Sequence, residues 1–344
     1  MDCKDVLSHF NSTQEAVETI STRLDVSKGT VNRWIKLERI PPAYSLDLMK
    51  ILEMEIDYSK FTFIEKDQFY TPIETAGACY ETFCRVLTQL GEDETTFSYI
   101  EPSAGNGSFL SVLPPNRTIG LDIEPRQNDI QQQDYLDWKP LHDKRYVVFG
   151  NPPFGLRGNL ALRFINHSTE FAEYVCFILP QLFESDGKGV PKRRVKRLNL
   201  IYSGKIPSLF YSPEQKEIQV HTIFQIWSRA HSSPKYAHTQ NTSENSKLKI
   251  YSLSDGNTSS STRNKKMLHR CDMYIPSTCF GAETMRWYES FEDLPGRRGY
   301  GIVFKEKKDE MSSRCKHMDL SQVAFQSTNG AYNIRSSQIL GMFN

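Results

Sequence analysis

The sequence lacks the features that mark membrane, secreted and metal-binding proteins. It has no apolar run long enough to span a bilayer, and residues 1–10 do not follow the basic-then-apolar pattern of a secretion signal. Its seven cysteines include no Cys-x-x-Cys pair, so we expect reduced, mostly structural thiols and no metal site. The formal net charge of +1 does not by itself indicate a polyanionic partner. We therefore expect an intracellular protein without a membrane partner, in the cytoplasm or nucleoid of a prokaryote or the nucleus of a eukaryotic host.

The chain is long enough for more than one domain. At 344 residues, 38% of them hydrophobic, it fits about two to three domains with a sizeable core. The expected parts are a helical module at 1–58, an α/β domain at 66–232, a flexible polar loop or linker at 233–266, and a C-terminal subdomain at 267–344. The linker is expected because Ser, Thr, Asn and Lys dominate that stretch.

Helical periodicity runs through residues 11–52. Val17, Ile20 and Leu24 mark one apolar face, and Val31 and Trp34 mark another. This pattern predicts a small all-α module of short helices.

The stretch from residue 16 to 52 resembles helix-turn-helix proteins of the phage-repressor type. The resemblance places a recognition helix at 27–36 and implies that Lys28, Asn32 and Arg33 face DNA bases or phosphates. The alternative is a three-helix protein-docking module with a solvated polar face.

Between residues 69 and 230, strand-like apolar runs alternate with helical segments. The runs are FSYIEP, RTIGLDIEP, YVVFGNPP, YVCFILP and IQVHTIFQIW. This alternation predicts a parallel sheet with crossover helices.

Residues suited to nucleotide binding stand where these runs end. The segment 105–107, Gly-Asn-Gly, follows the first run, where glycines permit a tight turn and the close approach of a ligand. Asp122 ends the next run, at the position from which an α/β nucleotide-binding fold grips a ribose diol. Asp134 can accept a hydrogen bond from an adenine amino group, and Tyr135 can flank its ring. The loop lacks the Gly-x-Gly-x-x-Gly spacing that cradles a pyrophosphate, which disfavours a dinucleotide-binding fold.

The tetrapeptide Asn151-Pro152-Pro153-Phe154 follows the run YVVFG. An amino nitrogen conjugated to a ring or carbonyl is a poor nucleophile, because its lone pair is delocalised. Asn151 offers a side-chain carbonyl and Pro152 a backbone carbonyl to the N–H groups, and the two prolines fix the turn. With Phe154 placed to stack on the ring, the tetrapeptide indicates alkylation of an amino nitrogen.

In this order, the motifs resemble the S-adenosylmethionine-dependent N6-adenine DNA methyltransferases of the amino-methylating class, in a gamma-like arrangement. The resemblance covers residues 69–229. It implies a Rossmann-like class I methyltransferase fold of the α/β class with a mostly parallel seven-stranded sheet. A small all-α helix-turn-helix domain would precede this fold, and a small C-terminal subdomain, in the family's usual place for target recognition, would follow it.

The resemblance also assigns roles to individual residues. For the cofactor it implies Thr71, Glu101, Ser103, Ala104, Gly105, Asn106, Gly107, Asp122, Ile123, Asp134 and Tyr135. For catalysis it implies Asn151, Pro152, Pro153 and Phe154. Phe210, with Tyr211 as the alternative, is the candidate for a second aromatic over the flipped base.

A basic run follows the fifth strand-like segment. Its cations are Lys192, Arg193, Arg194, Lys196 and Arg197. We expect them to contact a phosphate backbone, although such runs also form solvated faces or nuclear import signals.

The function expected from these residues is methylation of the N6 amino group of adenine in DNA, most readily a duplex, by direct transfer from S-adenosylmethionine to a flipped base. A homodimer or a partner subunit is compatible with this expectation. The same motif logic serves adenine methylation in RNA and glutamine methylation in proteins, so both remain alternatives. A further alternative is a non-catalytic DNA-binding regulator that has the methyltransferase fold.

Overall fold

The computed structural model divides the chain into two compact units. The first, here called the sheet unit, comprises Met1–Leu179 and Val195–Tyr236, and the second, the C-terminal unit, comprises Pro180–Arg194 and Ala237–Asn344. The structure describes residues 3–24, 26–141, 144–185, 190–236, 243–256, 258, 261–320, 323–326 and 331–343. Within these ranges, no helix is both long and apolar enough to cross a membrane.

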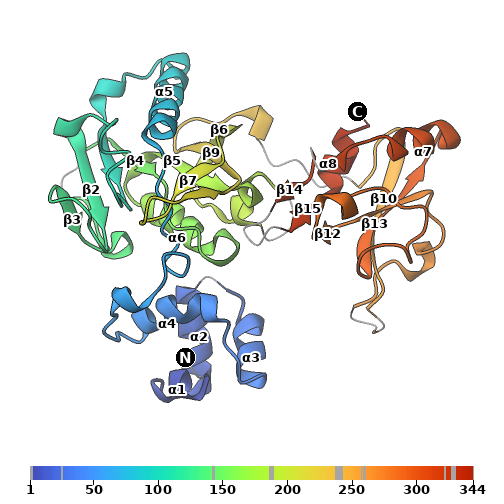
Figure 1. Ribbon diagram of the computed structural model, residues 1–344, viewed down its shortest axis with the longest axis horizontal. Helices are drawn as coiled ribbons and strands as arrows, with labels where there is room; N and C mark the ends of the chain where they lie inside the picture. The colour runs from blue at the N-terminus through green and yellow to red at the C-terminus, as the bar shows by residue number, and fades with distance from the viewer. Residues whose placement is uncertain are drawn as a thin grey trace. The chain divides into compact units, whose positions relative to one another are not determined.

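The sheet unit begins with a cluster of short helices, drawn in blue in Figure 1. They are α1 (Cys3–Ser8), α2 (Thr13–Arg23), α3 (Lys28–Lys36) and α4 (Ser45–Ile51). Ser12 and Ser27 cap α2 and α3, because their side chains accept hydrogen bonds from backbone N–H groups in the first turns. Ile20, Val31 and Leu48 contribute to a separate apolar core of this helical module.

A seven-stranded sheet forms the centre of the sheet unit, in the order β3-β2-β1-β4-β5-β9-β6. Its strands are β1 (Ser98–Glu101), β2 (Thr118–Asp122), β3 (Ile130–Gln132), β4 (Tyr146–Gly150), β5 (Ala172–Pro180), β6 (Asn199–Lys205) and β9 (Thr222–Ser228). The pairs β3–β2, β2–β1, β1–β4 and β4–β5 are parallel, and β9–β6 is antiparallel. The predicted α/β class with a mostly parallel seven-stranded sheet is therefore confirmed.

Helices cover both faces of this sheet, with α5 (Ile73–Leu90) and α6 (Asn159–Ser168) on opposite sides in Figure 1. Phe149 of β4 packs on Phe83 of α5, with ring centroids 5.8 Å apart. Tyr146 packs on Phe171, just after α6, at 6.1 Å. Phe149 and Tyr146 are an odd number of residues apart, so their side chains point to opposite faces. All five residues of β4 are buried, as expected for a strand covered on both sides.

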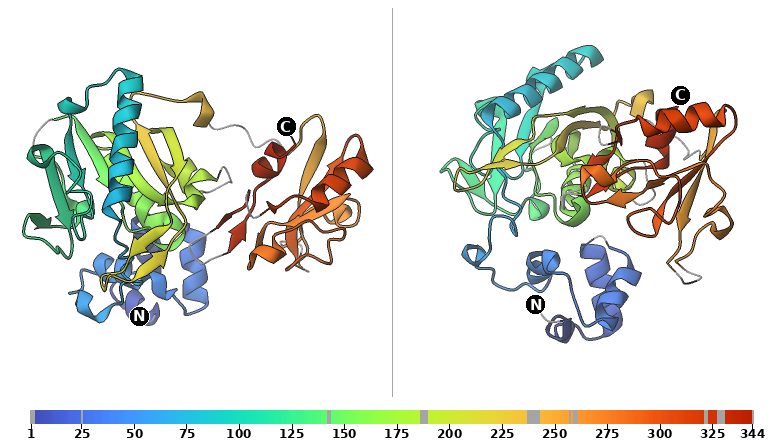
Figure 2. Two further views of the ribbon diagram at one scale, coloured as in Figure 1. Left: turned by 45° about the horizontal axis from the view of Figure 1, so that its top comes forward. Right: turned by 45° about the vertical axis from the view of Figure 1, so that its right-hand side comes forward.

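A two-stranded hairpin of β7 (Leu209–Tyr211) and β8 (Glu217–Gln219) lies outside the seven-stranded sheet. Figure 2 shows it in yellow as a projection beside that sheet. Tyr70 and Tyr211 exchange two backbone hydrogen bonds of 2.7 and 2.9 Å. The extended segment before α5 is thereby joined to the hairpin that carries Phe210.

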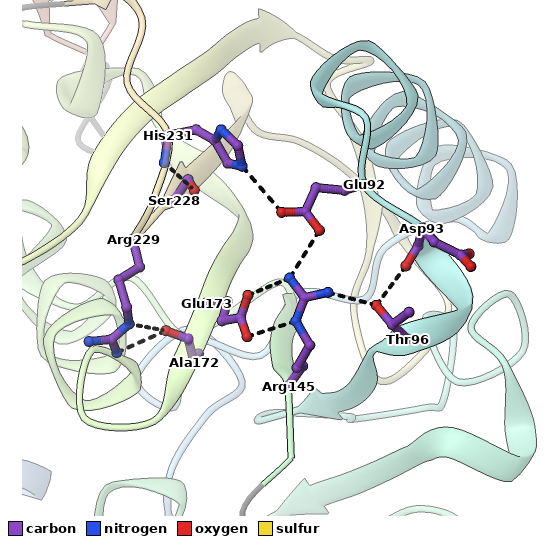
Figure 3. Close-up of polar contacts among 9 residues, drawn as sticks. All are labelled: Glu92, Asp93, Thr96, Arg145, Ala172, Glu173, Ser228, Arg229 and His231. Carbon is purple, nitrogen blue, oxygen red and sulfur yellow. Dashed lines mark hydrogen bonds and ion pairs between the residues drawn. The ribbon is translucent and has the colours of Figure 1, made fainter.

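An ion-pair network closes the amino ends of the parallel strands (Figure 3). Arg145, which precedes β4, binds Glu173 at 2.7 Å and Glu92 at 2.9 Å. His231 Nε2 lies 3.3 Å from the other oxygen of Glu92. The Arg145 guanidinium also lies over the Phe97 ring, 4.2 Å from its centroid. The network joins residues that precede β1 and β4, the second residue of β5 and a residue that follows β9.

The C-terminal unit is built on two small antiparallel sheets, β10-β13-β11 and β12-β15-β14. Their strands are β10 (Leu248–Ser254), β11 (Met273–Pro276), β12 (Thr278–Cys279), β13 (Arg298–Phe304), β14 (Phe325–Gln326) and β15 (Tyr332–Asn333), and the helices are α7 (Lys308–Lys316) and α8 (Ser336–Gly341). Ile250, Ile302 and Ile334 are buried in one apolar core.

Strand β10 lies inside the stretch 233–266, which the sequence predicts to be a flexible polar linker. Leu248 and Ile250 are buried in the core of the C-terminal unit, and β10 pairs along its whole length with β13. Within this polar stretch lies the short segment LKIYSLS, of which Leu248, Ile250, Leu253 and Ser254 are buried. Residues 248–254 therefore belong to the folded C-terminal unit and not to a linker.

Candidate active site

The candidate site lies at the carboxyl ends of β1, β2 and β4. Glu101, Asp122 and Gly150 are the last residues of these strands. Because the three strands are parallel neighbours, their ends bring together the glycine loop, the Asp122 carboxylate and the turn that begins at Asn151. The strand order reverses between β1 and β4, which is where open α/β sheets bind their ligands.

The glycine loop is held against Asp122. Gly105 and Gly107 have φ angles of 53° and 80°, which favour glycine. The N–H of Gly105 donates to Asp122 Oδ2 at 2.8 Å, and the N–H of Glu124 donates to Oδ1 at 2.7 Å. Burial raises the pKa of Asp122, and these two N–H groups offset part of the rise. The loop and the carboxylate therefore form one preassembled unit.

Glu101 is a fully buried carboxyl group at the base of the site. Its side chain is 1% exposed, and neither oxygen has a hydrogen bond of ordinary geometry to the described residues. Burial raises its pKa well above the ordinary value; the Ser103 backbone N–H offsets part of this, and the nearby Asp122 charge adds to it. Gly150 leaves the space that this carboxyl group fills, because a Cβ there would collide with Glu101 Oε1. The arrangement keeps two acceptor oxygens available for a cationic ligand.

Thr71 has a similar unused polar group. Its side chain is 4% exposed, and within the described ranges its Oγ1 has no hydrogen-bond partner. The residue directly precedes Pro72, the N-cap of α5. A buried hydroxyl without a partner is costly, so Thr71 fits a ligand-binding role better than a structural one.

The Asn151 side chain is oriented with its oxygen unoccupied. Its Nδ2 donates to the Phe69 carbonyl at 3.0 Å, which fixes the direction of the amide. Oδ1 is buried and accepts no hydrogen bond from any residue that the structure describes. The Ser103 hydroxyl donates to the Asn151 backbone carbonyl at 3.1 Å and ties the turn to the glycine loop. Asn151 thus presents an oriented acceptor.

An open hollow lies beside Asn151. Its lining comprises Asp67, Phe69, Asn151, Pro152, Phe154, Phe210, Val220 and Thr222. Phe69, Phe154 and Phe210 give the hollow aromatic residues from three separate segments, and Phe154 and Phe210 are only 6% and 1% exposed. The sequence names Asn151, Pro152, Phe154 and Phe210 as a group, and the structure brings these four together.

Two lining residues have no sequence signal of their own. Asp67 Oδ2 accepts a hydrogen bond of 2.5 Å from the Gly155 N–H, across 88 positions of sequence. Burial raises the pKa of Asp67, and the N–H groups of Gly155 and Phe154 oppose this rise. Phe69 contributes the carbonyl that orients Asn151. The segment 67–71 therefore braces the turn that begins at Asn151 from outside the sheet.

Asp134 and Tyr135 differ in how well they fit the predicted adenine site. Asp134 Oδ1 accepts from the Leu136 N–H at 3.0 Å, and Oδ2 is paired with Lys50. Tyr135 is 1% exposed, and its hydroxyl is hydrogen-bonded to Ser168 Oγ at 2.6 Å. Its ring packs on Phe164 of α6, with centroids 5.1 Å apart. Tyr135 is therefore packed against the core in this structure, and its place beside the cofactor ring stays a prediction.

The other residues assigned to the cofactor lie along the same strand ends. Ala104 is buried, and its N–H donates to the Leu121 carbonyl at 2.8 Å. Asn106 Oδ1 accepts from Ser108 Oγ at 2.8 Å. Ile123 directly follows Asp122 and is partly exposed. Their contacts with a cofactor remain predictions.

The residues predicted to bind DNA fall in different places. Lys28, Asn32 and Arg33 are exposed on α3, where Lys28 pairs with Glu18 at 2.8 Å. Lys192, by contrast, is 6% exposed within η8 (Pro191–Arg194). The cations Lys192, Arg193 and Arg194 belong to the C-terminal unit, whereas Lys196 and Arg197 are exposed in the sheet unit. The five therefore do not form one continuous exposed run, because burial removes Lys192 from the surface.

No protein-family model and no curated protein matches the chain. Among solved structures, it is similar to a protein of Pyrococcus horikoshii assigned as an RNA methyltransferase, with 15% identity over 47% of this chain and 86% of that one and a TM-score of 0.35. It is also similar to a modification subunit assigned to a type I restriction enzyme of Vibrio vulnificus YJ016, with 11% identity over 92% of this chain and 70% of that one and a TM-score of 0.35.

At these low identities and TM-scores, the fold class rests on the sheet itself. Its strand order, with the site at the carboxyl ends of β1, β2 and β4, defines an α/β fold with a mostly parallel seven-stranded sheet.

Proposed function

We propose that this protein binds S-adenosylmethionine and methylates the N6 amino group of adenine in DNA. The observation that carries the proposal is Asn151 Oδ1, a buried acceptor without a partner among the described residues, in a hollow lined by Phe154 and Phe210. An exocyclic amino group is a donor on a flat ring, and this combination of acceptor and aromatic side chains complements it.

The residues at the strand ends fit the cofactor. The oxygens of Glu101 suit its ammonium group, and the Thr71 hydroxyl suits its polar amino acid end, both being unsatisfied within the described part of the chain. Asp122, at the end of β2, suits the ribose hydroxyls, and Asp134 suits the adenine amino group. When bound, the cofactor supplies an electrophilic methyl group on a sulfonium.

The residues of the turn then act on the target base. Asn151 Oδ1 and the Pro152 carbonyl accept the two N6 hydrogens, which localises the nitrogen lone pair for attack. Phe154 stacks on the base, an interaction worth about 1–3 kcal/mol. Extracting the base from a duplex costs a few kcal/mol, so the stacking energy offsets much of the cost of flipping. No side chain needs to form a covalent intermediate.

The preference for DNA rests on the helical module. The α3 helix exposes Lys28, Asn32 and Arg33 on one surface, which suits a helix placed in the major groove. Lys196 and Arg197 supply further exposed cations for phosphates. A protein glutamine substrate would require neither feature. A second copy of the chain or a partner subunit would complete recognition of a longer site.

The test is methyl transfer from labelled S-adenosylmethionine to duplex DNA, single-stranded DNA, RNA and protein extract, followed by nucleoside analysis. We expect labelled N6-methyladenine in DNA. Label confined to RNA or to protein glutamine would refute the DNA assignment, and cofactor binding without any transfer would favour the regulator.

A pair of variants assigns the activity to the turn. Asn151→Ala is expected to reduce transfer more than 100-fold, because losing one oriented acceptor of this kind removes about 2.7–4 kcal/mol of transition-state stabilisation. Cofactor affinity should stay nearly unchanged. Asn128→Ala, at an exposed loop position, is the matched control and should behave as the wild type.

A further inference from the structure

Thr222, the first residue of β9, carries a second unused polar group in the same hollow. Its side chain is 2% exposed, and it lines the hollow together with Asn151 and Phe210. Its Oγ1 has no hydrogen-bond partner anywhere in the described ranges. Because a buried hydroxyl without a partner lowers stability, its presence calls for a ligand that satisfies it.

The other two polar side chains that line the hollow, those of Asn151 and Asp67, have no free hydrogen-bond donor to offer a ligand. The Asn151 Nδ2 donates a hydrogen bond to the Phe69 carbonyl, so only the side-chain oxygen remains for a ligand. Asp67 accepts from the Gly155 N–H. A hydroxyl can donate as well as accept a hydrogen bond. Among the described residues that line the hollow, Thr222 therefore has the side chain that can donate to a ligand.

Adenine requires one donor of this kind. Its N6 group offers two hydrogens, which suit Asn151 Oδ1 and the Pro152 carbonyl. On either side of N6, the ring nitrogens N1 and N7 are acceptors, and flipped bases are read through such edges. If the residues lining the hollow offered only acceptors, N1 and N7 of the adenine would both lack a hydrogen-bond donor.

We propose that Thr222 is a specificity-determining residue that donates a hydrogen bond from its hydroxyl to the ring nitrogen beside the amino group of the bound adenine. This inference rests on the proposed function, because it assumes that the hollow receives the target base. The hydroxyl then disfavours a base that has a ring N–H at the corresponding position, because the hydroxyl and the ring N–H would be two hydrogen-bond donors facing each other.

The experiment compares Thr222→Val with Thr222→Ser. Valine keeps the branched shape and removes the hydroxyl, whereas serine keeps the hydroxyl. We expect Thr222→Val to lower kcat/KM for methyl transfer to DNA about ten-fold, the effect of one hydrogen bond, and Thr222→Ser to stay within about three-fold of the wild type. Cofactor affinity should not change in either variant. Normal transfer by Thr222→Val would overturn the proposal.

Analogue DNA identifies the ring nitrogen. Fragments are prepared with 7-deazaadenine or with 1-deazaadenine in place of adenine, and the ratio of wild-type to Thr222→Val activity is measured on each. The ratio should fall to about one on the analogue that lacks the nitrogen contacted by Thr222. If the ratio on both analogues equalled the ratio on unmodified DNA, the contact with a ring nitrogen would be refuted. Any effect of an analogue on DNA recognition is common to the wild type and Thr222→Val, so it cancels in the ratio.

Two measurements do not depend on methyl transfer. The Tm of Thr222→Val in the free protein should not fall, since the hydroxyl has no partner to lose; a clear fall would indicate a structural role and overturn the proposal. Binding of a single-stranded oligonucleotide with one 2-aminopurine, followed by its fluorescence, should weaken about ten-fold in Thr222→Val. Weakened binding with no methyl transfer by the wild type would sustain the base contact and refute the proposed function. Unchanged binding would refute the base contact, whatever the activity.

Discussion

Lys50 Nζ forms an ion pair with Asp134 Oδ2 at 2.6 Å, which joins α4 of the helical module to the segment after β3. Arg163 of α6 pairs with Asp47 at 3.0 Å, and Asn159 Nδ2 donates to the Leu24 carbonyl at 2.8 Å. These contacts are polar, and of their residues only Leu24 belongs to the apolar core of the helical module. The carboxylate proposed to hold the cofactor adenine is thus already in contact with the proposed DNA-binding module.

Asp134 and Lys50 should affect cofactor affinity differently. Asp134→Ala removes the acceptor for the adenine amino group and should weaken S-adenosylmethionine binding about ten-fold. Lys50→Met removes a competing donor and should leave the affinity equal or slightly higher. Isothermal titration with the cofactor alone measures both. If Lys50→Met weakened binding as much as Asp134→Ala, Lys50 would be part of the cofactor site and not a competitor for it.

Asp67 should position the catalytic turn. Asp67→Ala removes the acceptor for the Gly155 N–H and should lower kcat about ten-fold without changing cofactor affinity. Asp67→Asn retains an acceptor oxygen and should keep most of the activity. Hydrogen exchange at the Gly155 amide should be faster in Asp67→Ala and near wild type in Asp67→Asn. Equal exchange in all three proteins would contradict the positioning role.

The same residue predicts a pH dependence. Burial raises the pKa of Asp67, so its carboxylate is protonated at a higher pH than an exposed aspartate. As the pH falls through this raised pKa, the Gly155 N–H loses its charged acceptor, and the methyl-transfer rate should decrease modestly toward that of Asp67→Asn. Asp67→Asn has no group that titrates there, so its rate should lack this acid limb. A pH–rate profile of the two proteins measures the difference.

Glu101 should make the free protein less stable as the pH rises. Burial raises its pKa well above the unfolded value of about 4.3, so the folded state binds the proton more tightly than the unfolded state. The stability associated with the protonated carboxyl group is fully present below pH ~4.3 and is lost as the pH rises through the folded pKa. Glu101→Gln should remove this loss. Urea unfolding from pH 4 to 8, without cofactor, should show the wild type falling below Glu101→Gln at the higher pH values; parallel curves would contradict the burial argument.

Arg145 should stabilise the sheet away from the site. Arg145→Met removes the ion pairs with Glu92 and Glu173, drawn in Figure 3, and should reduce the free energy of unfolding by about 1–2 kcal/mol. Lys139→Met is the control, because its pair with Glu170 is 3.5 Å long and exposed, and it should cost less than about 0.5 kcal/mol. Cofactor affinity should stay unchanged in both. Equal losses in the two variants would show that the network adds nothing beyond surface pairing.

The sheet could be predicted from the sequence because its signals are local. The runs YVVFG and YVCFILP are apolar throughout, and they form β4 and β5, whose side chains are buried on both faces. Strands β3 and β6 of this sheet and β10 of the C-terminal unit lack such long apolar runs, and the sequence does not predict them. Tyr135 shows a related difficulty. That it follows Asp134 in the sequence does not reveal whether its ring faces a ligand or packs in the core.

The contacts that complete the site could not be predicted, because they join distant positions. Asn151 and Phe69 are 82 positions apart, and Asp67 and Gly155 are 88 apart. Neither Asp67 nor Thr222 belongs to a local pattern that distinguishes it from other aspartates and threonines. Their roles follow from burial and from unsatisfied hydrogen-bonding groups, which depend on the folded chain.

The C-terminal unit is assembled from two separated segments, Pro180–Arg194 and Ala237–Asn344. Gln181 Oε1 accepts from the Gln326 N–H at 3.1 Å, and Arg335 Nε donates to Ser185 Oγ at 3.3 Å, across 145 and 150 positions. During synthesis, the earlier segment must therefore wait for almost the whole remaining chain before it finds these partners, while β6 and β9 can pair sooner. A protein truncated after residue 236 would leave the segment 180–194 without its native neighbours. Tests of the isolated sheet unit should therefore use the full chain as their reference.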